Sequence, residues 1–133
     1  PTQCWIVSAP SRTKAYKNGK SVKVKRSEIQ LFALFEPAKN IYGQISFTSG
    51  YPFKSGSSVK VSIGSSEHIL SQTDGEWAWP KSSRENEELL SSLRRGAKAL
   101  ISGVSSKGTR TKDTFSLLGF SAAYGEAQKR CGT

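Results

Sequence analysis

Short runs of alternating residues, separated by turn signals, constrain the fold of this chain more than any other feature of its sequence. Runs such as YGQISFTS and SSVKVSI have a period near two, and the segments GYPFKSG, GSS and TDGE interrupt them. Asn18-Gly19 stands between alternating residues, which is a strong signal for a tight β-hairpin. Turns that return about every 8–12 residues predict a mainly β, antiparallel sandwich or barrel.

Three segments depart from simple alternation. The run IQLFALF at 29–35 is apolar throughout and predicts a central strand covered on both faces, which Pro37 ends. A segment at 82–96 predicts a short α-helix, with Ser82 and Glu85 spaced as a capping box. A second short helix is expected from about Phe120 to the last cysteine.

The two cysteines, Cys4 and Cys131, lie near the two ends of the chain. Their positions predict a disulfide that joins the ends of a single domain over residues 1–133, since the ends of domains often lie close together. Such a disulfide indicates an oxidising compartment. The chain has no Met, so we expect that a segment upstream of Pro1 has been removed; no run of about 18 apolar residues predicts a membrane span.

Residues 103–111 come close to a phosphate-binding loop. Gly103 and Gly108 have the required spacing, but Thr109 stands where that motif needs the lysine that reaches the phosphates. The residues that follow alternate like a strand, whereas a phosphate site needs a helix N-terminus there. We therefore predict a hairpin turn at Lys107-Gly108 and no nucleotide site.

The sequence offers no convincing catalytic or metal-binding set. His68 is the only histidine, and one histidine with two distant cysteines does not make a usual zinc site. A serine–histidine–aspartate triad would need Asp74 or Asp113, and no GxSxG motif accompanies them. The three carboxylates at 84–88 are explained by the electrostatics of a helix start. We predict no enzyme and no cofactor, with a hydrolase using His68 as the alternative.

The formal net charge of +10 favours a negatively charged partner. The densest basic stretch holds seven cations in fifteen positions without an acid: Arg12, Lys14, Lys17, Lys20, Lys23, Lys25 and Arg26. Because Lys23 and Lys25 alternate with valines, we expect them to share one face of a strand. The stretch is a candidate site for a polyanion such as a glycan, lipopolysaccharide or anionic lipid. The alternative is a solvated edge hairpin whose lysines prevent aggregation.

Trp77 and Trp79 are expected on the same side of a strand. Exposed indoles stack on sugars or bases, so the pair is a candidate aromatic contact, although the pattern favours packing in the core. If both tryptophans and the lysines lined one concave face, a barrel-type nucleic-acid-binding module would be the alternative function.

Four segments make the chain resemble the invasion-associated locus B family. They are CWIVSAP, ISFTSGYPFKSGSSVKVSIG, GEWAW and SSKGTRTKDTFSLLGFSAA, in this order across nearly the whole chain. The resemblance implies an immunoglobulin-like β-sandwich, a signal peptide, and a periplasmic, outer-membrane-associated or surface location. It also implies a protein associated with host-cell invasion, a role that fits a binding, adhesion or envelope-maintenance module and brings no catalytic residues. The dense basic stretch at 12–26 departs from the family's general pattern.

Overall fold

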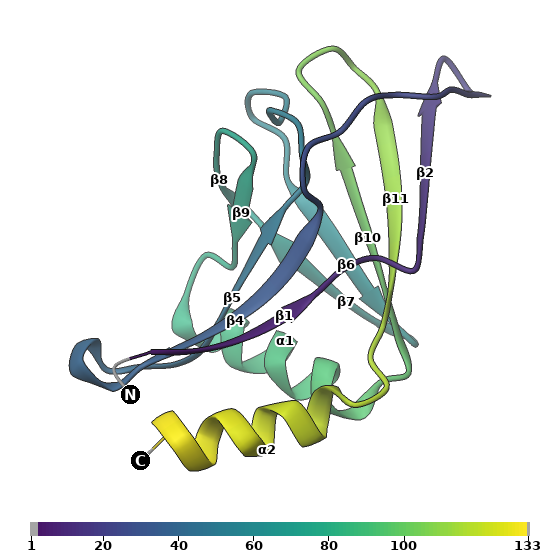
Figure 1. Cartoon of the computed structure of the whole chain (residues 1–133). Helices are drawn as coiled ribbons and strands as arrows, with labels where there is room; N and C mark the ends of the chain where they lie inside the picture. Colours follow the sequence, from purple (N-terminus) through teal and green to yellow (C-terminus); the bar gives the residue numbers. More distant parts are fainter. Residues whose placement is uncertain (1–2, 133) are drawn as a thin grey trace.

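The computed structural model describes residues 3–132, which form two antiparallel sheets that pack face to face, with two helices at one end (Figure 1). In spatial order, the first sheet, sheet A, consists of β1 (Cys4–Ser8), β4 (Gln30–Glu36), β5 (Ile41–Thr48), β9 (Trp77–Trp79) and β8 (Gln72–Asp74). The second, sheet B, consists of β3 (Lys20–Ser21), β2 (Arg12–Lys17), β11 (Arg110–Ser116), β10 (Lys98–Val104), β6 (Val59–Ile63) and β7 (Ser66–Leu70). The helices are η1 (Pro37–Lys39), α1 (Ser83–Arg95) and α2 (Phe120–Cys131). The expected mainly β sandwich with two α-helices is confirmed.

The core lies between the sheets and is built from the inward-facing half of each alternating strand. Phe47 of β5 and Phe115 of β11 are both fully buried, and their rings meet edge to face at 6.2 Å. Val59 and Val61 of β6 are buried beside them. The period of two seen in the sequence therefore corresponds to burial on one face of each sheet.

The expectation that the apolar run at 29–35 is covered on both faces is wrong. In β4, Leu31, Ala33 and Phe35 are buried, whereas Phe32 and Leu34 are half-exposed on the outer face of sheet A. No helix covers that outer face within residues 3–132; α2 packs on the inner side instead. The run is apolar throughout because its inward residues belong to the core and its outward residues form an apolar surface, not a second core layer.

Helix α1 begins and ends where its sequence signals predict. The Ser82 hydroxyl accepts a hydrogen bond from the Glu85 backbone N–H at 3.2 Å, and Leu89 and Leu93 are buried against the sheets. The side-chain amide of Asn86 accepts from the Ile45 N–H and donates to the Gly43 carbonyl. This amide bonds to the part of β5 that β9 does not reach, so it ties the helix to the end of the sandwich.

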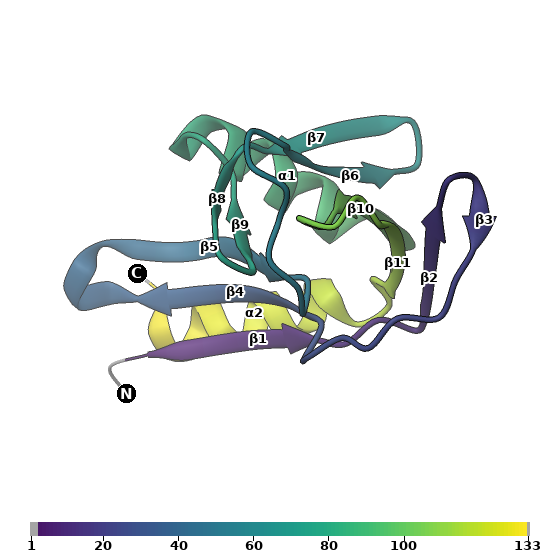
Figure 2. The same cartoon turned by 90° about the horizontal axis from the view of Figure 1, so that it is seen from above.

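Helix α2 crosses below sheet A and returns the chain to its starting point (Figures 1 and 2). The ring of Tyr124 packs on the ring of Phe35 at 5.3 Å. At the helix end, Cys131 forms a disulfide with Cys4, whose Cα atoms lie 6.0 Å apart, so the predicted pairing is confirmed. No helix within residues 3–132 is long and apolar enough to cross a membrane.

Candidate functional site

The outer face of sheet B gathers basic side chains from four neighbouring strands. Lys14 of β2 lies directly opposite Lys112 of β11, and Tyr16 lies opposite Arg110. Residues opposite each other in an antiparallel pair project from the same face, and every second residue joins them. The exposed cations on this surface, which we call the basic face, are Arg12, Lys14, Lys60, Lys98, Arg110 and Lys112.

Like charges lie opposite each other on the basic face without an acid to separate them. The pair Lys14–Lys112 occupies directly opposed positions, which is destabilising for a sheet. The contact of the Lys112 ammonium with the Tyr16 ring, at 5.8 Å, offsets only part of this repulsion. A bound anion would relieve the remainder.

The cations of the basic stretch at 12–26 do not form one surface in the structure. Arg12 and Lys14 project from the basic face, and the turn of the β2–β3 hairpin, at Asn18-Gly19, carries Lys17 and Lys20. The cations Lys23 and Lys25 are exposed but follow β3 in a segment without strand structure, so the expectation that they share a strand face is wrong. Pairing in β3 stops at Ser21 because the chain then crosses from sheet B to sheet A (Figure 2).

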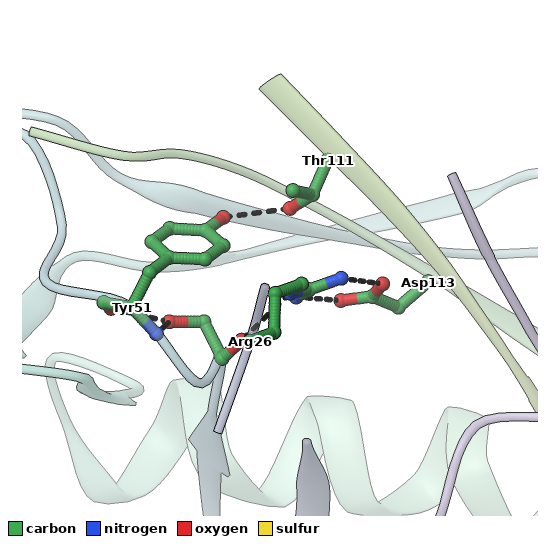
Figure 3. A network of polar contacts seen from close by, with 5 residues as sticks. Arg26, Tyr51, Thr111 and Asp113 are labelled. Atoms are coloured by element: carbon green, nitrogen blue, oxygen red, sulfur yellow. Dashed lines mark hydrogen bonds and ion pairs between the residues drawn. The ribbon is translucent and has the colours of Figure 1, made fainter. Parts of the chain in front are cut away.

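Arg26 does not belong to the exposed cations. Its side chain is 7% exposed and donates two hydrogen bonds to the carboxylate of Asp113, at 2.6 and 2.8 Å (Figure 3). Its Nε also donates to the carbonyl of Ser49 at 3.0 Å. A buried carboxylate needs a cation with good geometry, and the planar guanidinium supplies it. Arg26 is therefore a structural residue, not a contact for a partner.

The ion pair continues into a polar network at the same end of the sandwich. The Arg26 guanidinium lies over the Tyr51 ring at 5.1 Å, and the Tyr51 hydroxyl shares a hydrogen bond of 2.6 Å with Thr111 (Figure 3). Burial is the main reason that the pKa of Tyr51 is raised, so the phenol stays neutral. Beside it lies a cleft of about 360 Å³, with Lys25 and Lys107 among its lining residues.

The segment that resembled a phosphate-binding loop is a β-hairpin, as predicted. β10 and β11 pair from Lys98 to Val104 and from Arg110 to Ser116, and Gly108 takes a positive φ in the turn. Gly103 has a packing role, because a Cβ there would lie 2.7 Å from the Tyr51 hydroxyl oxygen. The first glycine of the apparent motif is thus explained by close packing.

His68 contacts a serine that the sequence did not single out. Its Nε2 lies 2.9 Å from the hydroxyl of Ser92 in the last turn of α1. Burial lowers the pKa of His68, and the nearby carboxylate of Glu88 opposes this shift. The backbone N–H groups around Ser92 are used within the helix, so they offer no oxyanion hole. Within residues 3–132, no group of three His, Cys, Asp or Glu side chains could hold a metal.

The tryptophans are not in the core, so the favoured interpretation of that pair was wrong. Trp77 is 38% exposed and Trp79 is half-buried, and both project from the outer face of sheet A with their rings nearly parallel at 6.5 Å. They lie on the opposite side of the sandwich from the basic face. The geometry required for the barrel-type nucleic-acid groove is therefore not present.

The sequence did not reveal which strands would contribute the remaining side chains of the basic face on sheet B and of the aromatic surface on sheet A. The alternation of Arg110 and Lys112 was visible, but their pairing with a strand about a hundred residues earlier was not. Trp5 and Phe32, whose rings continue the surface of Trp77, gave no signal that they would meet it.

These features define a disulfide-closed β-sandwich with a basic outer face on one sheet and an aromatic outer face on the other. The family model described as invasion associated locus B (IalB) protein matches residues 2–128. The chain therefore belongs to the invasion-associated locus B family. Comparison with curated proteins and with solved structures gave no match.

Proposed function

We propose that this protein is an exported, non-catalytic envelope or surface module that binds a polyanion through its basic face. Membership of an invasion-associated family and the Cys4–Cys131 disulfide, which suits an oxidising compartment, support export. The observation that carries the polyanion assignment is the like-charge pair Lys14–Lys112, which the fold keeps in direct opposition at a cost in stability.

The charges of the basic face are available to a partner. Among the described residues, none forms an ion pair with Arg12, Lys14, Arg110 or Lys112, whereas Lys60 pairs with Glu67 at 3.4 Å. Cations held on one rigid sheet produce a stronger local potential than the same charges scattered over the surface. Closely spaced sulfate or phosphate groups of a glycan, lipopolysaccharide or anionic lipid match this arrangement.

The cations of the β2–β3 hairpin extend the site beyond the sheet. Lys17 and Lys20 lie at the tip of an arm that projects from the edge of sheet B (Figure 2). Lys23 and Lys25 follow on the strand-free segment. Because these contacts are exposed and individually weak, binding depends on their number, and salt at physiological strength screens it over about 8 Å.

Heparin affinity at several salt concentrations tests the proposal. The variant Lys14→Gln, Arg110→Gln, Lys112→Gln should lose affinity and show a weaker dependence on salt, because three contacts with the polyanion are gone. The matched control is Lys81→Gln, Arg84→Gln, Lys129→Gln, which removes the same charge from exposed positions near α1 and on α2. Equal loss in both variants would mean that only total charge matters, and no loss in either would mean that the face is merely solvated.

The contact between His68 and Ser92 is the one observation that favours the alternative, a hydrolase. Ser92 is 6% exposed and lies within α1, so a substrate carbonyl has little access to its hydroxyl. We therefore assign the contact a structural role. A fluorophosphonate probe, which reacts with activated serines, should leave the folded protein unlabelled; labelling at Ser92 would contradict the non-catalytic assignment.

A further inference from the structure

Four aromatic side chains form a continuous strip across the outer face of sheet A. The ring of Trp5 lies 5.9 Å from that of Phe32, Phe32 lies 5.5 Å from Trp77, and Trp77 lies 6.5 Å from Trp79. Trp5 is 54% exposed, so the strip opens to solvent at its β1 end as well as at β9. We call these four residues the aromatic strip.

Small residues on the intervening strand make the strip continuous. β5 lies between β4 and β9 in the sheet, and on the outer face it places Ser46 opposite Phe32 and Thr48 opposite Trp77. A large side chain at either β5 position would separate the two rings. With serine and threonine there, the rings meet above β5 and the strip spans β1, β4, β5 and β9.

The stability of the fold does not explain this surface. The core lies on the other face of the sheet, where Phe35 and Phe47 are fully buried. Val7, which is 49% exposed, and Leu34 enlarge the apolar area beside the rings. Contiguous exposed apolar patches on soluble proteins usually mark sites of interaction.

The outer face of sheet A lacks the positive charge of the outer face of sheet B. In a chain of net charge +10, the positions that project from the outer face of sheet A carry neither Lys nor Arg. The polar groups there are mainly amides and hydroxyls, with carboxylates only near the periphery: Gln30, Glu36, Gln44, Ser46, Thr48, Gln72 and Asp74. In the part of the chain that the structure describes, the side chains of Gln44, Ser46 and Gln72 have no hydrogen-bond partner. Such a face complements an uncharged, hydroxyl-rich partner and disfavours a polyanion.

We propose that the aromatic strip is a binding site for an extended, uncharged polysaccharide, separate from the polyanion site on sheet B. One face of a β-linked pyranose presents C–H groups with partial positive charge, which meet the negative face of an aromatic ring favourably. Its equatorial hydroxyls point sideways, where the free amides of Gln44 and Gln72 can bond them. A chain of such sugars is flat and elongated, as the strip is.

Other occupants fit these observations less well. A single-stranded nucleic acid would stack on the rings, but its phosphates would find no cation and would approach Asp74. A second copy of the chain would have to pair the amides of Gln44 and Gln72 with its own amides, and any amide left unpaired in the buried interface would be costly. A polysaccharide can stack its C–H faces on the rings and form hydrogen bonds with the amides.

The test is titration of the folded protein with the neutral probes cellohexaose and chitohexaose, followed by tryptophan fluorescence and calorimetry. We expect saturable binding of at least one of the two. Trp5→Ala and Trp77→Ala should each lower its affinity by about tenfold, the scale on which removing one stacking ring acts elsewhere. Leu118→Ala, an exposed apolar position outside the strip, and Lys14→Gln with Lys112→Gln are the controls and should leave the affinity unchanged.

Four results would overturn the proposal. The first is the absence of a saturable signal from either hexasaccharide at millimolar concentration, and the second is binding that survives the combined Trp5→Ala and Trp77→Ala changes. The third is self-association in the ultracentrifuge that these changes abolish. The fourth is binding to phosphatidylcholine vesicles in place of the sugars. The last two would assign the face to a second copy or to lipid. None of these probes carries a net charge, so a negative result here does not affect the outcome of the heparin experiment on the basic face.

Discussion

Arg26 and Asp113 form a buried, bidentate ion pair that joins two parts of the chain 87 residues apart in the sequence. Asp113 lies on the inner face of β11, and Arg26 reaches it from the strand-free segment that crosses between the two sheets. The pair therefore fixes the path of that crossing segment, and with it the position of the exposed cations that precede Arg26.

Replacing Arg26 by Met should strongly destabilise the fold, because the Asp113 carboxylate would remain buried without a partner. The expected loss is about 3–5 kcal/mol in the free energy of unfolding, measured by urea denaturation. Adding Asp113→Leu should recover much of that loss, since no charge is then left in the interior. The matched control, Arg12→Met, removes an exposed arginine and should change stability little; an equal loss in both single variants would show that the buried pair is not special.

Opening the disulfide between Cys4 and Cys131 should also lower stability. It links residues 127 apart in sequence, and the chain-entropy model gives about 4–5 kcal/mol for a loop of that size. Denaturation of the double Cys→Ser variant, compared with the oxidised protein, measures this contribution. The far-UV circular dichroism should keep its β-sheet character, because both sheets are held by contacts elsewhere. A reducing agent that left the midpoint of the oxidised protein unchanged would contradict the prediction.

Stability should fall as the pH drops below about 6.5, and His68 should be responsible for part of the fall. Burial lowers the pKa of His68 in the folded protein below its usual value of 6.5, so the unfolded chain binds the proton more readily. The contribution of His68 is therefore complete above that value and is lost as the pH decreases through the pKa of the folded state. Comparing the pH dependence of the melting temperature with that of His68→Gln isolates the effect, and identical slopes would exclude it.

Removing the opposed charges of the basic face should stabilise the protein while weakening its binding. Lys112→Gln ends the repulsion with Lys14, and relief of one directly opposed like-charge pair contributes about 0.2–1 kcal/mol. Thermal unfolding at low salt measures this gain, which should shrink as salt is added. Lys129→Gln, on the exposed side of α2, serves as the control. A lysine whose loss reduced both stability and heparin affinity would instead be acting through the fold.

The sequence alone determined most of the elements of this protein and its covalent closure. Alternation with period two predicted the strands, because one face of a sheet is buried and the other is not. The cap at Ser82 and the stop at Gly96 predicted α1 to within a residue at each end, since those signals act locally. The pairing of Cys4 with Cys131 followed from their places at the two ends of the chain.

Only the tertiary structure decided what the two surfaces are, because both depend on which strands become neighbours. The pairing of β2 with β11 places Lys14 opposite Lys112, and the order of sheet A brings Trp5 and Phe32 to Trp77. The same long-range packing buries Arg26, which looks like its exposed basic neighbours in the sequence. A local pattern shows how residues alternate, but whether a given side chain meets solvent, an acid or another ring is set by elements distant in the chain.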